Sequence, residues 1–235
     1  SGCGVGFKML QAFSKTNNID LKQLYPFLDL VAVSIASDIV PIIDENRTLA
    51  YYGLQQLNEN PGTGLKAIMD MSGLSEKDHE VVVEDVVFRI GPRINAAGRI
   101  ESGRSAVDLL ITENKRKAEM MGRKVNSCND TRKSIDHNIT QDALKMIAYE
   151  PGFREKKSTV LYNSNWHKGV VGIVASRMIE IYYRPTIILT ASNGMATGSA
   201  RSIPGFDIYR ALEECSDLLE NFGGHMYAAG LTMDV

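Results

Sequence analysis

The sequence has few of the residues that mark secreted, zinc-binding or membrane-spanning proteins. Its 235 residues include three cysteines, which lie far apart and form no Cys-x-x-Cys pair. This excludes a disulfide framework and a cysteine zinc site, and it is typical of a reduced cytosolic protein. No apolar run reaches the roughly 18–20 residues that a membrane-spanning helix needs, and Ser1–Gly6 lacks the features of a signal peptide. We therefore expect a cytoplasmic protein without a membrane partner.

Charge, aromatic content and common catalytic signatures are equally uninformative about function. The formal net charge is −2 and there is a single tryptophan. Any nucleic-acid site must therefore be a local patch rather than a global basic field, and the scattered aromatic residues form no RNA-recognition platform. The sequence contains no P-loop, Gly-x-Ser-x-Gly elbow or His-Glu-x-x-His motif. Function has to be inferred from less familiar local patterns.

Hydrophobic spacing predicts helices in much of the first part of the chain. Phe7–Thr16 and Asp44–Met71 have the helical pattern, with turn chemistry interrupting the second at Asn60–Gly64. The aliphatic run Leu28–Pro41 reads as a buried strand followed by a loop, although periodicity cannot separate a strand from a buried helix. Residues 84–104 are rich in arginine and broken by glycine, which is typical of a loop.

The second part of the chain has a different pattern. Residues 105–148 read as one or two long helices, polar nearly all round, as in a helix that bridges two domains. Strands and helices alternate beyond Pro151, with expected strands at 158–162, 186–190, 198–203 and 228–235 and expected helices at 172–182 and 206–220. This alternation predicts an α/β domain that begins near Pro151.

The first candidate for chemistry is Asp38, at the polar end of the aliphatic run. A carboxylate at the end of a strand is where open α/β sheets place ligands and metals. The alternative is that Asp38 caps a turn before Pro41. Metal-assisted cleavage of phosphodiesters generally needs several carboxylates around two ions, so Asp38 alone cannot form such a site.

The second candidate is the segment from Arg89 to Arg104, especially Gly91–Arg99. The planar guanidinium suits phosphate oxygens, and small neighbouring residues allow close approach of a backbone. The alternative is a charged surface loop paired with carboxylates such as Glu84 and Asp85. The density of arginine and glycine favours contact with phosphate.

Two further candidates lie in the α/β part. Between 166 and 177 a strand turns through glycine into a helix whose N-terminus can attract an anion, and His167 lies just before it. Gly198–Ser202 offers hydroxyls and a guanidinium at one place, and Gly223-Gly224-His225 follows later. The alternatives are glycines needed only for packing, a surface histidine, and a loop without function.

Taken together and in order, these motifs resemble the DHH/DHHA1 phosphoesterase superfamily, specifically its RecJ exonuclease branch. The resemblance rests on 28–41, Arg-Ile-Gly-Pro-Arg-Ile-Asn-Ala-Ala-Gly-Arg (89–99), Trp-His-Lys-Gly-Val-Val-Gly-Ile (166–173), Gly-Ser-Ala-Arg-Ser (198–202) and Phe-Gly-Gly-His (222–225). It spans nearly the whole chain. Each motif is weak by itself, but the ordered set is specific.

The resemblance implies an α/β fold in three parts. Residues 1–104 correspond to the C-terminal part of a DHH catalytic domain, 105–150 to a long connecting helix, and 151–235 to a smaller mixed-sheet DHHA1 domain that binds nucleic acid. Substrate lies in the cleft between the two domains. The family often adds an oligonucleotide-binding fold, which this sequence does not contain up to Val235.

The resemblance also implies roles for individual residues. Asp38 matches the last metal motif, and the segment with Arg93, Asn95 and Arg99 would face the scissile phosphate. The pocket for the 5′ end of the substrate would be formed by Ser199, Arg201 and Ser202. The path of the DNA would be lined by His167, Gly223, Gly224 and His225.

One departure from the family pattern limits what the chain can do. The family's Asp-x-Asp, further Asp and Asp-His-His motifs are all missing from this sequence, so it reads as a fragment that begins past the third metal motif. The intact protein is expected to use two Mn²⁺ or Mg²⁺ ions to digest single-stranded DNA 5′→3′ to mononucleotides in repair and recombination. The chain alone is expected to be inactive. Repair-protein partners cannot be named.

Two other functions remain open at this stage. One is a phosphoesterase for small substrates such as oligoribonucleotides or cyclic dinucleotides. The other is a non-catalytic relative that only binds single strands. The arginine block at 89–99 and the long polar helix favour the exonuclease.

Overall fold

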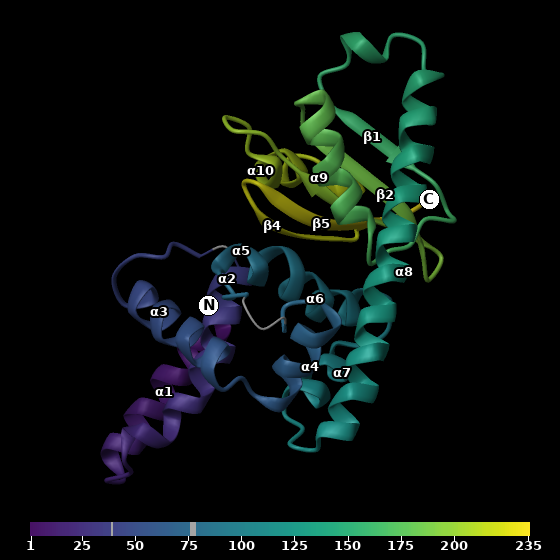
Figure 1. The fold of residues 1–235 in the computed structure, drawn as a ribbon. Coiled ribbons are helices and arrows are strands. Elements are labelled where there is room, and N and C mark those ends of the chain that lie inside the picture. The colour runs from purple at the N-terminus through teal and green to yellow at the C-terminus, as the bar shows by residue number, and fades with distance from the viewer. Residues whose placement is uncertain (39, 76–78) are drawn as a thin grey trace. The chain divides into compact units, whose positions relative to one another are not determined.

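The longest element of the structure is α8 (Lys115–Ala148), a helix of 34 residues. At 1.5 Å per residue it is about 50 Å long. In this computed structural model, which describes residues 1–38, 40–75 and 79–235, the chain divides within α8 into two units, Ser1–Asp130 and Thr131–Val235. Figure 1 shows helices in the first unit and a sheet with helices in the second. The predicted α/β class is therefore confirmed, and the boundaries near 104 and 150 stay a prediction.

The first unit is built from helices that precede and include the start of α8. They are α1 (Gly2–Thr16), η1 (Leu21–Phe27), α2 (Leu28–Ser37), α3 (Asp44–Glu59), α4 (Thr63–Met71), α5 (Val83–Asp85), the π-helical turn η2 (Val86–Ile90), α6 (Gly91–Ile100) and α7 (Gly103–Leu110). The helices expected at 7–16 and 44–71 are confirmed, and the second is broken where turn chemistry was predicted. The expected long helical stretch from 105 onward is two helices, α7 and α8.

The aliphatic run that was read as a strand is the helix α2, so that prediction was wrong. One side of α2 packs against a small core with Phe7 and Ala50, where Val31 and Ile35 are buried. Its other side, with Val33, lies in the main core of the unit. A helix buried on two sides is apolar nearly all round, so it carries no polar stripe that would have revealed the helical period.

The arginine-rich segment is also helical, which corrects the expectation of a loop. It forms η2, α6 and α7. Pro92 lies in the first turn of α6, where its missing N–H costs nothing. Ile90, Ala96 and Ala97 are almost fully buried, and Ile90 and Ala97 anchor the segment in the main core. The arginines therefore project from a packed helix rather than from a loop.

The second unit contains a five-stranded sheet in the order β1-β2-β3-β5-β4. Its strands are β1 (Thr159–Tyr162), β2 (Thr186–Ser192), β3 (Met195–Arg201), β4 (Asn221–His225) and β5 (Ala228–Met233). β1 runs parallel to β2 and the other pairs are antiparallel, so the sheet is mixed. The four expected strands are confirmed. β4, which contains the Gly-Gly-His motif, was not among the expected strands.

Helices cover both faces of this sheet. α9 (Val171–Tyr182) packs on β2 and β3, while α10 (Ile208–Glu213) packs through Ile208 and Leu212 on Ala200 and Leu231 from the opposite face. The helix expected at 206–220 is shorter than predicted and is followed by η4 (Ser216–Leu218). Another short turn, η3 (Phe153–Glu155), follows α8. No helix in the described part of the chain is long and apolar enough to cross a membrane.

Candidate functional site

Asp38 lies directly after α2, at the end of a helix rather than of a strand. Its N–H donates to the Ser34 carbonyl at 3.0 Å, and its carboxylate accepts a hydrogen bond from the Ser34 hydroxyl at 3.2 Å. The side chain is exposed. Asp38 is therefore accessible to a ligand, and its role as a metal ligand stays a prediction.

The start of α6 lies against the end of α2. A Cβ on Gly91 would come within 2.6 Å of the Ser37 hydroxyl oxygen and 3.1 Å of the Val86 carbonyl. Only glycine allows this close approach. It places the arginine-bearing helix beside the residue that precedes Asp38, although the two are more than fifty positions apart in sequence.

Arg93 is turned into the protein. Its Nε donates to Asn126 Oδ1 of α8 at 2.9 Å, and its terminal nitrogens donate to the carbonyls of Arg89 at 2.7 Å and Met71 at 3.4 Å. Burial lowers the pKa of Arg93, and nearby Asp130 acts in the opposite direction. Arg93 thus ties α6 to α8, a role that the sequence did not reveal. Its predicted contact with the scissile phosphate stays untested.

Asn95 and Arg99 lie one helical turn apart on α6, so both project from the same side of the helix. Both side chains are exposed. Of the three residues predicted to face the scissile phosphate, these two present their polar groups to the surface while Arg93 does not.

The described residues do not by themselves form a metal site. No group of three or more His, Cys, Asp or Glu side chains among them is placed to hold an ion. Asp29 is the buried acid nearest in sequence to Asp38, and burial raises its pKa. Its oxygens, however, accept from the N–H groups of Leu30 at 2.6 Å and Gly62 at 2.8 Å. Asp29 therefore joins α2 to the start of α4, and Asp38 is the single ligand that the sequence analysis assigned.

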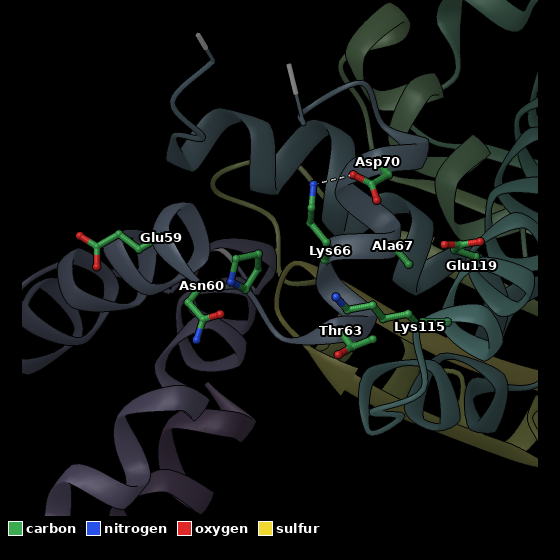
Figure 2. A pocket seen from close by; sticks show the side chains of 10 residues that line it. Glu59, Asn60, Thr63, Lys66, Ala67, Asp70, Lys115 and Glu119 are labelled. Atoms are coloured by element: carbon green, nitrogen blue, oxygen red, sulfur yellow. Dashed lines mark hydrogen bonds and ion pairs between the residues drawn. The ribbon is translucent and has the colours of Figure 1, made fainter. Parts of the chain in front are cut away.

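A hollow of about 410 Å³ lies between the end of α3, α4 and the start of α8 (Figure 2). Lysine and acidic side chains both line it. Lys66 donates to Asp70 at 2.7 Å and to the Ser75 hydroxyl at 2.8 Å. Burial acts to raise the pKa of Asp70, but the interactions of its carboxylate with Lys66 and Ser75 outweigh burial and lower it. Because it is lined by charges of both signs, this hollow favours no ligand of one sign, and none of the predicted site residues lines it.

In the second unit, Ser199 and Arg201 project from one face of β3. Arg201 donates to the Ser199 hydroxyl at 2.6 Å and to the Ala200 carbonyl at 2.8 Å. A Cβ on Gly172 would lie 3.0 Å from both the Arg201 guanidinium and the Ser199 hydroxyl. The first turn of α9 therefore rests directly on these two side chains. A guanidinium, a hydroxyl and a helix N-terminus at one place form a site suited to an anion.

Gly172 was not singled out in the sequence, although it lies inside the 166–177 motif. The glycine at the start of the expected helix was the available signal, because a helix that crosses a strand this closely needs a residue without a side chain at the crossing point. The first turn of α9 also lacks a side-chain cap. The N–H groups of Val171 and Ile173 donate to the carbonyls of His167 and Val170 at 3.3 and 2.8 Å, so an anion here would be held mainly by the Arg201 guanidinium and the Ser199 hydroxyl.

His167 shapes the loop that leads into α9. Its carbonyl accepts from the N–H groups of Val170 at 2.9 Å and Val171 at 3.3 Å. Its Nδ1 accepts from the Gly169 N–H at 3.1 Å, so the neutral ring carries its proton on Nε2. The residue is half-buried. Nε2 is thus the atom with which His167 would donate to a ligand.

The strands beyond β3 add a floor of glycine on the same face as Ser199 and Arg201. Ser199 is in register with Gly230 of β5, which is in register with Gly223 of β4. Both glycines are exposed, and a Cβ on Gly223 would meet no atom within 4 Å. With no side chains in the way, a ligand can lie directly on the backbone here. Gly230 was not identified from the sequence.

His225 borders this floor. It lies in the same row as Arg201, since both are in register with Ala228. It is exposed, and its Nδ1 accepts from the Tyr227 N–H at 3.2 Å. Gly224 has φ +154°, and a Cβ there would lie 2.3 Å from the Ala228 carbonyl. The structure therefore needs glycine at 224 for strand pairing, whatever its contact with substrate.

Ser202 has a structural role in this unit. Its hydroxyl donates to the Phe206 carbonyl at 2.7 Å, which closes the turn ahead of α10. Its predicted contact with substrate stays untested. The structure thus brings Ser199, Arg201 and the glycine floor with His225 onto one face of the sheet.

Comparison with known proteins identifies the family of the chain. Residues 155–235 match the family model of the DHHA1 domain. The single-stranded-DNA-specific exonuclease RecJ of Bacillus subtilis is 38% identical over 237 residues, and that of Salmonella typhimurium is 34% identical over 253 residues. By sequence and by fold, the chain belongs to the RecJ family.

Solved structures of RecJ support the same assignment. The crystal structure of RecJ in complex with Mg²⁺ from Thermus thermophilus superposes with a TM-score of 0.86 at 31% identity, covering 98% of this chain and 35% of that one. A crystal structure of exonuclease RecJ bound to manganese gives a TM-score of 0.82 at 31% identity and covers 100% of this chain and 57% of that one.

The alignments cover almost all of this chain but only part of each relative. They include 99% of this chain and 29% of the Bacillus subtilis protein, and 100% of this chain and 43% of the Salmonella typhimurium protein. The chain thus spans less than half the length of these RecJ relatives. The predicted relationship to RecJ-type exonucleases, which are hydrolases, is confirmed.

Proposed function

We propose that this chain is the part of a 5′→3′ single-stranded DNA exonuclease that holds the 5′ end of the substrate. The observation that carries the proposal is the close approach of Gly172 to Ser199 and Arg201, since a Cβ at position 172 would lie 3.0 Å from each side chain. It places a guanidinium and a hydroxyl under the first turn of α9. A terminal phosphate, with its charge of up to −2, fits this combination better than a single phosphodiester does.

The glycine floor gives the rest of the strand a place to lie. Gly230 and Gly223 are exposed and follow Ser199 across the sheet. The sugar-phosphate backbone of the first nucleotides would rest on this floor. His225 at its border and Nε2 of His167 would donate to phosphate oxygens. None of these contacts reads a base, which suits an enzyme that digests any sequence.

In the first unit, Asn95 and Arg99 would contact the scissile phosphate from the exposed side of α6, while Arg93 holds that helix on α8. Catalysis would need Mg²⁺ or Mn²⁺, the ions named with the related RecJ structures. Asp38 would be one ligand, and the remaining ligands would lie outside the described residues. The products would be mononucleotides, and the biological setting DNA repair and recombination.

Fluorescence anisotropy with single-stranded DNA tests the proposal directly. The chain is titrated with a short oligonucleotide that carries either a 5′-phosphate or a 5′-hydroxyl, across a series of salt concentrations. Tighter binding of the phosphorylated strand is expected, and Arg201→Ala should abolish the difference. Arg210→Ala, a change to an exposed arginine of α10 in the same unit, is the matched control and should preserve it.

Equal binding of the two oligonucleotides by the unmodified chain would contradict the 5′-end pocket. A small-substrate phosphoesterase would give another result, because a dinucleotide would then bind as tightly as a longer strand. A 5′-phosphorylated dinucleotide is therefore included in the titration.

A further inference from the structure

A groove lined by cationic side chains lies in the unit 131–235, between the latter half of α8 and α9. Its volume is about 590 Å³. The side chains that line it come from α8 and α9, and they are Arg132, Lys133, Asp136, His137, Thr140, Gln141, Leu144, Arg177 and Ile181. None of them belongs to the site around Arg201.

The centre of this groove is a buried acid bound to an arginine. Asp136 is only 2% exposed. Its two oxygens accept from Nε and NH2 of Arg177 at 2.9 and 2.8 Å, which is the two-pronged geometry of a strong pair. Oδ2 also lies 3.6 Å from Arg132, and Oδ1 accepts from Thr140 at 3.5 Å. The carboxylate is therefore surrounded by donors.

This pair fixes the position of Arg177. Two of the five guanidinium N–H groups donate to Asp136, and the side chain lines the groove and is 49% exposed. The hydrogen bonds that Arg177 donates to Asp136, together with the charges of Asp136 and Glu180, raise the pKa of Arg177 and outweigh burial, which acts to lower it. Arg177 is thus a permanently charged and pre-oriented donor, which is what recognition of a phosphate requires.

A second row of donors runs along α8. Lys133, His137 and Gln141 are spaced four residues apart, so they project from the same side of the helix at steps of about 6 Å. All three are exposed. The lining includes the permanent cations Arg132, Lys133 and Arg177 against the single carboxylate of Asp136. The groove therefore has surplus positive charge on a chain whose net charge is −2.

The far end of the groove is apolar, with Leu144 from α8 and Ile181 from α9. Ile181 is 53% exposed. Cations at one end and an apolar surface at the other suit a nucleotide unit, with its phosphate on the cations and its sugar or base on the apolar side chains. A small inorganic anion would leave the apolar end without a contact.

We propose that this groove is a second site for the backbone of single-stranded DNA, some nucleotides away from the end held at Arg201. This rests on the proposed function. The two sites share α9, because Gly172 in its first turn lies on Arg201 whereas Arg177 and Ile181 lie roughly 8 and 14 Å further along the helix axis. A strand that is long enough contacts both sites, and a very short one contacts only the first.

The test uses 5′-phosphorylated oligothymidylates of 3 and 20 nucleotides with the chain and its variants. The double variant Lys133→Ala/His137→Ala is expected to bind the 20-mer severalfold more weakly than the unmodified chain. The slope of log affinity against log salt should fall by about 1 for each phosphate that the variant no longer binds. Binding of the 3-mer should stay unchanged. Lys145→Ala/Asn138→Ala, on exposed positions of the same helix outside the groove, should match the unmodified chain.

Arg177→Lys provides a second variant that keeps the charge beside Asp136 but removes the two-pronged geometry. Weaker binding of the 20-mer with an unchanged melting temperature would support a direct contact. If the unmodified chain and Lys133→Ala/His137→Ala bind the 20-mer with equal affinity and equal salt dependence, the proposal that the groove binds DNA is overturned. Loss of the 5′-phosphate preference alone would count against the Arg201 pocket, and absence of any binding would count against both.

Discussion

Arg93 of α6 donates from Nε to Asn126 Oδ1 of α8 at 2.9 Å. This bond, with two further bonds to backbone carbonyls, places an arginine of the predicted phosphate-binding motif in the scaffold. The motif therefore has two kinds of arginine. One positions the helix, and Arg99, further along the same helix, projects from its exposed side.

Arg93→Ala should destabilise the first unit. It would leave Asn126 and two carbonyls without this donor, and the loss of such bonds in a partly buried site costs about 1–3 kcal/mol. Urea unfolding followed by circular dichroism measures the change. Arg99→Ala, at an exposed position of the same helix, should change the free energy of unfolding by less than about 0.5 kcal/mol. Equal effects of the two changes would contradict this division of roles.

Gly172→Ala should weaken binding of a 5′-phosphate without unfolding the protein. The new Cβ would lie 3.0 Å from Arg201 and Ser199, so either the guanidinium or α9 must shift. Anisotropy with phosphorylated and unphosphorylated strands measures the loss of preference. Gly103→Ala in the first turn of α7, where a Cβ meets nothing within 4 Å, is the control. An unchanged preference in Gly172→Ala would count against the pocket.

Asp85 should make stability depend on pH. Burial acts to raise its pKa, but hydrogen bonds with His79 at 2.9 Å and the Val82 N–H at 3.2 Å outweigh burial and lower the pKa from its ordinary value of 3.8. A carboxyl whose pKa is lower in the folded state stabilises the protein above its unfolded pKa. That contribution is lost as the pH falls through the lowered value.

The variant Asp85→Asn should therefore be less stable than the unmodified protein at pH 7, by about 1 kcal/mol for a side chain that caps a helix start. The difference should shrink once the pH falls below 3.8. Thermal melts from pH 7 to pH 3 measure it. Asp108→Asn is the control, because that carboxylate is 43% exposed and lies 3.8 Å from Arg104. A difference that grows at low pH would show that Asp85 acts in another way.

The chain by itself should not cleave DNA when Mg²⁺ or Mn²⁺ is added. Among the described residues no three metal-binding side chains come together, and phosphodiester cleavage by two ions needs several carboxylates. Gel analysis of an end-labelled single strand measures this. Metal-dependent cleavage by the purified chain that disappears in Asp38→Ala would prove the expectation wrong.

Several elements could be predicted because their signal is local. β2 was recognisable from its apolar and β-branched residues. In the structure Asn193 and Gly194 join it to β3, with positive φ values of 54° and 79° that these residue types tolerate. α9 was recognisable from its spacing. The motif residues Ser199, Arg201 and His225 were assigned to a substrate site through the ordered resemblance to the RecJ branch, because the Gly-Gly-His motif by itself is equally compatible with a loop.

Other elements depended on contacts far along the chain. α2 was read as a strand because it is buried on two sides, and its surroundings were unknown without the fold. β4 contains two glycines and no apolar alternation, so only its pairing with β5 makes it a strand. Its glycines become a floor only once the sheet exists.

The sequence by itself determined the α/β character of the second unit, the RecJ resemblance and the kinds of residue that could hold phosphate. The tertiary structure decided which of them meet. It placed Gly172 on Arg201, turned Arg93 inward to Asn126, and set Arg177 against Asp136 across 41 positions of chain. Helix and strand propensity and motif chemistry depend on residues that are neighbours in sequence. Contacts between distant residues depend on how whole helices and strands pack, which no short stretch of sequence encodes.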